Sequence, residues 1–267
     1  KRAAEAGGTS ARIIGLEESE SSDLELFEVA ITEGNGGASP LWIVLVGHGT
    51  FDGREAKFNM RGDDLSAAQL AGWLEDADRP VVVINTTAAS APFIKTLSGE
   101  NRVIVSATKS GSEESFARFG QFLAEAIAAE GADIDGDGGT SLLEAFIKAS
   151  KDVAEFYEKE GRVATEQALI DDNGDGLGTP ASWFRGTRAV KSAKEGATPD
   201  GPRAHQFHIV PSEEERRMPA EVRERRDALE TELAALRAKR ETMEAAAYFA
   251  ELERIALALA EIYRDAE

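Results

Sequence analysis

The sequence predicts an α/β fold in which a parallel sheet is covered by helices. Three short stretches, 41–46, 81–85 and 103–107, are almost entirely apolar, as expected for strands that are buried on both faces of a sheet. Segments with helical length and pattern lie at 66–74 and 116–129. This alternation of buried strands and helices is typical of a parallel sheet with helices on its faces.

The N-terminal elements are read in the same way. Residues 1–6 resemble the end of a helix that two glycines terminate. A short strand is expected at 11–16, a helix at 24–31, and a loop at 34–40. Ser66 is expected to cap the helix at 66–74, because its hydroxyl can accept a hydrogen bond from a free N–H of the first turn.

The second half of the chain divides at its acidic loops and its linker. A long helix is expected at 141–160, between a first Asp/Gly-rich loop and a second one at 171–178. Residues 193–202 are rich in Pro, Gly and small residues, as linkers are. The expected parts are an α/β domain with both loops (1–192), a linker with a short strand (193–218) and a helical extension (219–267).

The helical extension carries a seven-residue repeat of apolar residues, continued by a stripe with 4-3-4-3 spacing. Such spacing predicts a coiled-coil seam or two helices that pack on each other. One interpretation is a hairpin docked on its own domain. The other is self-association or a partner helix, in which case deletion of the extension should change the association state. The stripe comprises Val222, Leu229, Leu233, Leu236, Met243, Tyr248, Leu252, Ile255, Leu259 and Ile262.

Composition excludes several classes of protein. The formal net charge is −19, which disfavours nucleic acid as a partner because phosphate contacts need a basic surface. The longest apolar run, 41–46, is far shorter than the roughly 20 residues of a membrane span. The sequence contains no cysteine, so this chain has no disulfide, thiolate zinc site or cysteine nucleophile.

Two strand ends carry unusual small or reactive residues. The first expected strand runs into Gly47, His48 and Gly49, and the second runs into Ala88 and its small neighbours. In an open parallel sheet, functional residues gather beyond the carboxyl ends of the strands. Small residues at such a corner keep a pocket open, although either sequence alone also fits a tight turn without chemistry.

Together and in this order, these segments resemble the legumain and caspase clan of cysteine peptidases. The similarity spans residues 41–130 and implies a caspase-like fold that acts on peptides or proteins, with His48 as the base and the Gly49 N–H as an oxyanion donor. The matching segments are His48-Gly49-Thr50 with Asp52-Gly53, then Ala88-Ala89-Ser90-Ala91 in place of the family's Cys-Glu-Ser-Gly, then residues 105–117.

The departure from this family lies at the nucleophile position, which is Ala88. A methyl group cannot attack a carbonyl, whereas the family's mechanism needs a nucleophile that His48 can deprotonate. Three interpretations follow: a natural pseudopeptidase, an alanine introduced to trap an inactive form, or a substitute hydroxyl nucleophile. The candidate hydroxyls are Ser90, Thr86 and Thr87, with Ser90 the foremost.

The first acidic loop, 133–144, follows the pattern of an EF-hand calcium loop. Oxygen ligands stand at positions 1, 3, 5 and 9, a glycine stands at position 6, and a glutamate that can bind through both oxygens stands at position 12. Ca²⁺ suits such a flexible cage of many oxygens better than Mg²⁺ does. The expected ligands are Asp133, Asp135, Asp137, the Gly139 carbonyl, Ser141 and Glu144.

The second acidic loop carries only the first half of the same pattern, at Asp171, Asn173 and Asp175. Its twelfth position is Ser182, so the loop is either a weaker site completed by another residue, such as Glu166, or a simple turn. Two further histidines, at 205 and 208, lie in an apparent strand at 205–210. There they would point to opposite faces, which favours structural roles.

Two classes of function therefore remain open. One is a calcium-stabilised, legumain/caspase-like peptidase fold that is inactive in this chain. The other is a calcium-binding interaction module that acts through its C-terminal helices. The family resembled has a central strand before its first helix, so either this sequence is a fragment or the first strand is absent, and the family's specificity pocket is not carried over. Calcium loops without cysteine favour an extracytoplasmic location.

Overall fold

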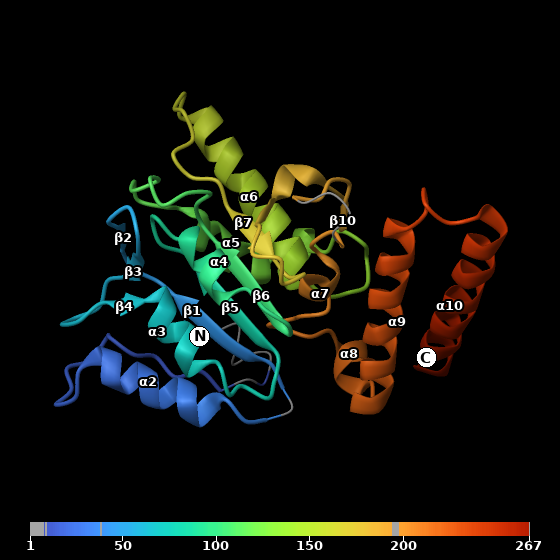
Figure 1. Ribbon diagram of the computed structural model, residues 1–267, viewed down its shortest axis with the longest axis horizontal. Helices are drawn as coiled ribbons and strands as arrows, with labels where there is room; N and C mark the ends of the chain where they lie inside the picture. The colour runs from blue at the N-terminus through green and yellow to red at the C-terminus, as the bar shows by residue number, and fades with distance from the viewer. Residues whose placement is uncertain (1–7, 9, 38, 194–197, 267) are drawn as a thin grey trace.

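A five-stranded mixed sheet forms the centre of the molecule (Figure 1). The computed structural model describes residues 8, 10–37, 39–193 and 198–266. Strands β1 (Leu41–Leu45), β5 (Val81–Asn85) and β6 (Arg102–Ser106) are neighbours and run parallel. Strands β7 (Leu169–Asp171) and β8 (Thr179–Pro180) extend the sheet beyond β6 in antiparallel pairing. The three predicted strands are confirmed, and the sheet is mixed rather than wholly parallel.

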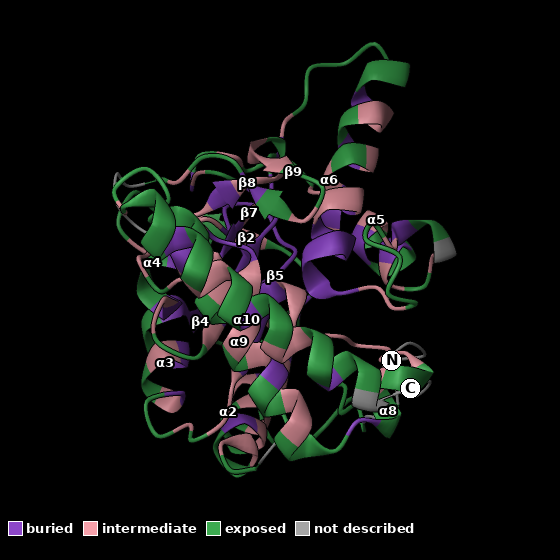
Figure 2. Cartoon of the chain, turned by 90° about the vertical axis from the view of Figure 1, so that its right-hand side faces the viewer, coloured by how far each residue is buried: buried purple, intermediate pink, exposed green. Residues whose placement is uncertain are grey.

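Helices cover both faces of this sheet, and alternate residues of each strand enter opposite cores. In β5, Val82 and Ile84 face one core, whereas Val81 and Val83 face the other. The burial pattern in Figure 2 places most buried residues at the sheet and the helix surfaces against it. The first core is covered by α5 (Phe119–Ile127) and α6 (Leu142–Lys159), the second by α2 (Asp23–Gly34), α3 (Ala67–Trp73) and α4 (Pro92–Leu97).

Three of these helices begin with the same serine cap. Ser22, Ser66 and Ser141 each accept a hydrogen bond from the N–H three residues later. The side chain at that later position in turn accepts a hydrogen bond from the N–H of the serine. This reciprocal capping box satisfies two N–H groups that a helix N-terminus leaves free. The cap predicted at Ser66 is confirmed, and Ser141 fixes where the first acidic loop ends and α6 begins.

A small antiparallel sheet follows β1 directly. It consists of β2 (Gly49–Phe51), β3 (Ala56–Phe58) and β4 (Leu65–Ser66), which the sequence analysis does not predict. The Asp52 carboxylate accepts hydrogen bonds from the N–H groups of residues 54 and 55, both at 2.8 Å. The Asp-Gly pair in this turn is the sequence signal for the hairpin. The small sheet fixes the position of the chain just after His48.

Two expected strands are absent. Residues 11–16 and 205–210 are described, and neither forms a strand. Ile13 and Leu16 are exposed, so their apolar pattern has no neighbouring strand or core to join. Residues 202–205 instead form a short helix, α7 (Pro202–His205), because Pro202 suits a first helical turn. The helix end expected at 1–6 lies outside the described residues. The remaining short elements are η1 (Glu130–Ala132), η2 (Ala181–Trp183), β9 (Phe184–Arg185), β10 (Arg188–Ala189) and α8 (Glu213–Arg217).

The C-terminal extension is a helical hairpin at one side of the molecule (Figure 1). Its helices are α9 (Ala220–Ala238) and α10 (Ala245–Ala266). The apolar stripe lies inside this hairpin, where the buried side chains of Leu236, Tyr248 and Ile255 pack together. This favours the hairpin interpretation of the repeat over a seam between copies. In the described part of the chain, no helix is both long and apolar enough to cross a membrane.

Deletion of residues 220–267 is therefore expected to leave the association state unchanged, because both helices that pack on each other are removed together. Deletion of residues 245–267 alone should cause self-association, because Leu229, Leu233 and Leu236 of α9 then lose their partners on α10. Static light scattering of the full chain and both deletions distinguishes these cases. If the first deletion changes the number of chains per particle, the hairpin joins copies of the chain after all.

Candidate functional site

The two motifs at the strand ends meet at one edge of the sheet. Leu45 of β1 lies opposite Asn85 of β5, so the segments that carry His48 and Ala88 leave the sheet side by side. The two segments approach each other closely at Gly49. A Cβ there would lie 2.3 Å from the Ala88 carbonyl oxygen and 2.5 Å from the Thr87 Oγ1. Only glycine fits this position, and the His48 turn is thereby held against the Ala88 turn.

A third loop, which follows β6, completes this edge. The Ala89 N–H donates to the Glu113 carbonyl at 2.8 Å, and Gly111 lies so close to the Phe51 ring that a Cβ would be 2.4 Å from it. Ala89 has a φ of +52°, a left-handed conformation that costs about 1–2 kcal/mol for a residue with a Cβ. Strained backbone of this kind is concentrated at functional sites.

The hydroxyl groups near Ala88 are all engaged in structural hydrogen bonds. The Thr86 Oγ1 donates to the Leu45 carbonyl at 2.8 Å, and the Thr87 Oγ1 donates to the Asn85 Oδ1 at 2.7 Å. Ser90 is fully buried. Its Oγ accepts from the N–H groups of residues 107 and 108 and bonds to the Thr108 Oγ1. These contacts join the Ala88 turn to the end of β6 and argue against Ser90 as a substitute nucleophile.

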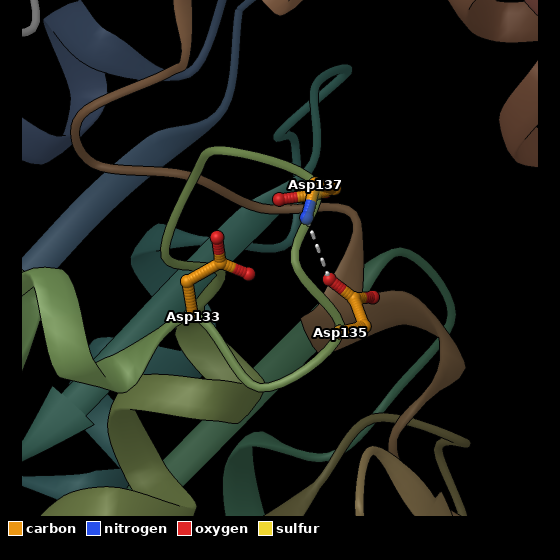
Figure 3. Close-up of side chains that lie close together, drawn as sticks. All are labelled: Asp133, Asp135 and Asp137. Atoms are coloured by element: carbon orange, nitrogen blue, oxygen red, sulfur yellow. Dashed lines mark hydrogen bonds between the residues drawn. The ribbon is translucent and has the colours of Figure 1, made fainter.

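The first acidic loop brings three aspartates together. One carboxylate oxygen from each of Asp133, Asp135 and Asp137 lies within 4.8 Å of the other two (Figure 3). The Asp133 carboxylate accepts from the N–H groups of Gly136 at 2.7 Å and Gly138 at 3.0 Å. Both glycines have a positive φ, which bends the loop around the carboxylates. Three carboxylates at this spacing are a suitable set of hard oxygen ligands for a divalent cation.

The other predicted ligands of this loop have different contacts. Glu144 is fully buried. Its Oε1 accepts from the Ile134 N–H at 2.7 Å, and its Oε2 accepts from the Ser141 N–H and Oγ. The Gly139 N–H donates to the Asp137 Oδ1 at 2.9 Å. Glu144 therefore joins the two ends of the loop and stays outside the cluster of three aspartates.

The histidines at 205 and 208 both lie against this loop. The His205 Nε2 is 3.1 Å from the Asp135 Oδ2, and its Nδ1 is 3.2 Å from the Ser141 Oγ. His208 approaches Gly139 so closely that a Cβ there would lie 3.3 Å from the ring. The prediction that the two rings point to opposite faces of a strand is wrong, because the segment turns at the end of α7. No spacing in the sequence indicates that these histidines reach a loop so distant along the chain.

The second acidic loop repeats the backbone geometry of the first. The Asp171 carboxylate accepts from the N–H groups of Gly174 and Gly176, both at 3.1 Å, and both glycines again have a positive φ. The Asn173 Oδ1 accepts from the Asp175 N–H at 2.8 Å. Among the described residues, no group donates a hydrogen bond to the buried Oδ2 of Asp175. Glu166 lies elsewhere and caps α5 by accepting from the N–H groups of residues 118 and 119.

Two buried carboxylates beside this second loop were not predicted. Asp200 accepts from the N–H groups of Asp172 and Asn173 and from the Thr179 hydroxyl. Burial, reinforced by the Asp172 charge, raises the pKa of Asp200 to about 8. Burial also raises the pKa of Asp135 and of Asp171. Buried carboxylates of this kind favour a proton or a cation nearby, because either one neutralises a charge that burial destabilises.

Comparisons of this chain with protein-family models, with curated proteins and with solved structures find no match. The edge at His48 presents an exposed imidazole and offers no nucleophile at residue 88. The two acidic loops offer oxygen ligands, before α6 and after β7 respectively.

Proposed function

We propose that this chain is a legumain/caspase-like peptidase-fold protein that binds peptides without cleaving them. The observation that supports this best is the approach of Gly49 to the Ala88 carbonyl, at the carboxyl ends of adjacent parallel strands. It brings the turn that follows His48 against the Ala88 turn, which supports the assignment of these residues to the base and nucleophile positions of the resembled family. The Ala88 side chain is 6% exposed, so the surface there is shaped mostly by its neighbours.

Each residue of this edge has a defined part in the proposed binding. The exposed His48 imidazole can hydrogen-bond to a peptide, and the Gly49 N–H can donate to a carbonyl oxygen. Attack on that carbonyl would need a deprotonated nucleophile within reach of His48. Ala88 has none, and the three nearby hydroxyls are bonded to structural partners. A bound peptide is therefore expected to remain intact.

The test is to supply the missing thiol. Because the sequence contains no cysteine, a thiol-reactive peptide probe can label Ala88→Cys only at position 88. We expect labelling at neutral pH at least tenfold faster than that of Ser112→Cys, a control thiol on the exposed loop after β6. The reason is that an adjacent imidazole increases the thiolate fraction. Adding His48→Ala should return the rate at position 88 to the control value.

The unaltered chain should leave the same peptides uncleaved over a panel of sequences. Cleavage by the unaltered chain that Ser90→Ala abolishes would overturn the proposal and restore the hydroxyl nucleophile. Labelling of Ala88→Cys that is no faster than the control, in a folded protein, would remove the support for a peptidase-like site at His48 and Ala88. That result would favour the second candidate function described next.

The second candidate is a calcium-stabilised interaction module that acts through its C-terminal helices, and the inert side chain at Ala88 favours it. We propose Ca²⁺ as the ion, held at 133–144 by the three converging aspartates and completed by the Gly139 carbonyl, Ser141 and Glu144. The second loop is proposed as a weaker site at Asp171, Asn173 and Asp175. Two loops with the same hydrogen-bond geometry support this proposal. Calcium binding is compatible with either function, and the thiol test distinguishes them.

A further inference from the structure

The short helix α7 and the residues after it lie between both acidic loops and the C-terminal hairpin. Two neighbours in sequence contact the two sides. His205 reaches Asp135 and Ser141 of the first loop. The next residue, Gln206, donates from its Nε2 to the Asp227 carbonyl of α9 at 2.8 Å and lies 3.3 Å from the Thr231 Oγ1. A single turn of chain therefore joins the loop to the hairpin.

We infer that Ca²⁺ binding in the loop 133–144 controls how firmly the α9–α10 hairpin docks on the body, through His205 and Gln206. This inference rests on the calcium site proposed above and adds a regulation to it. The connector 200–218 transmits the change. Coupling of this kind needs a contact that differs between the ion-free and ion-bound loop.

The contact that differs is the imidazole of His205. Of its two neutral tautomers, only the one protonated at Nε2 can donate to the Asp135 Oδ2 and accept from the Ser141 hydroxyl at once. In the ion-free loop the Ser141 hydroxyl has a second acceptor, the Glu144 Oε2 at 2.8 Å. An ion that takes Glu144 as a ligand removes this competitor, and the Ser141 proton is then free for His205. Outer hydrogen bonds of this type orient metal ligands.

Three further contacts strengthen the connection. The Leu142 N–H, at the start of α6, donates to the Phe207 carbonyl at 2.7 Å. From the second loop, the Asp172 carboxylate accepts from the N–H groups of Gly201 and Ala204 at 2.9 and 2.8 Å. On the hairpin side, Glu215 of α8 pairs with the buried Arg226 of α9. These bonds hold the connector in place, and Gln206 is the residue next to His205 that bonds to α9.

Hydrogen exchange of the α9 amides measures this docking directly, because exchange of protected amides reports the free energy of local opening. We expect saturating Ca²⁺ to slow exchange across residues 220–238 roughly tenfold, within the range usual for coupled sites. The full-length chain is used throughout, in calcium and in chelator. Calorimetry on the same samples measures calcium binding independently.

The variant that tests the route is Gln206→Ala, which removes the contact with α9 and no proposed ligand. Its exchange in α9 should no longer depend on calcium. Since coupling is reciprocal, its calcium affinity should fall by about the same factor of ten. The matched control is Gln121→Ala on the exposed side of α5, where the amide donates to Glu125 of its own helix. This control should behave as the unaltered chain in both measurements.

The outcomes separate the two proposals. The absence of any calcium heat in the unaltered chain would overturn the calcium site and this inference with it. Calcium heat with unchanged α9 exchange would overturn the inference alone. Calcium-dependent protection that persists in Gln206→Ala, with unchanged affinity, would show that the route does not pass through this residue and would also overturn it.

Discussion

Millimolar Ca²⁺ is expected to raise the free energy of unfolding by about 2.7 kcal/mol when free Ca²⁺ is a hundredfold above Kd, and by about 4.1 kcal/mol at a thousandfold. The gain arises because three carboxylates held within 4.8 Å of one another repel without a cation. For a chain of this size the melting temperature should rise by roughly 5–15 °C. Calorimetric or fluorescence melts in calcium and in chelator measure the shift.

Substitutions identify which loop gives the shift. Glu144→Gln should remove most of it, since the neutral amide cannot bind the ion through two anionic oxygens. Glu160→Gln, at the exposed end of the same helix, is the matched control and should retain the full shift. Asp175→Asn should change it little if the first loop is the dominant site. A melting temperature that is indifferent to calcium and chelator, together with no calcium heat, would contradict the assignment.

Gly49→Ala is expected to destabilise the fold by about 3 kcal/mol or more, at the upper end of overpacking effects. The added Cβ would lie 2.3 Å from a backbone carbonyl oxygen, that of Ala88. That atom cannot move without displacing the strained turn at Ala89, which is itself bonded to the loop after β6. Urea unfolding at equilibrium measures the loss, and in the Ala88→Cys background the probe reactivity should fall as well.

Gly72→Ala is the control for this substitution, and the sign of its effect is opposite. Gly72 is an exposed residue of α3 with nothing within 4 Å of an added Cβ. Replacing a helical glycine with alanine should stabilise the protein by about 0.5–1 kcal/mol. If Gly49→Ala were as stable as the unaltered chain, the His48 and Ala88 turns would not be in contact, and the proposed site would lose its basis.

Local signals predicted most of the sheet and its helices. The apolar runs at β1, β5 and β6 and the serine cap of α3 are properties of contiguous residues, so the sequence alone reveals them. The antiparallel addition of β7 was not foreseen, because its pairing with β6 depends on the path of α5 and α6 between them. The strand predicted from the apolar residues at 11–16 does not form for a related reason, since a strand also needs a neighbouring strand to pair with.

The candidate site was predictable only in part. The order of motifs at His48 and Ala88, and the aspartate spacing at 133–137, are both visible in the sequence. Their environment is not. The burial of Glu144, the reach of His205 to Asp135, and the buried Asp200 beside the second loop all come from contacts between segments far apart in the chain. A histidine pair three residues apart gives no indication of which loop it will meet.

The antiparallel pairing of β7 with β6 also has a consequence for the order of folding. Helices α5 and α6 and the first acidic loop all lie between these two strands in the chain. Closing so long a segment costs loop entropy, whereas contacts between near neighbours, as in the C-terminal hairpin, form quickly. We therefore expect the hairpin to form early and the arrival of β7 to limit the folding rate of the body. A cation that holds α5 and α6 together shortens the free segment, and it should accelerate this step.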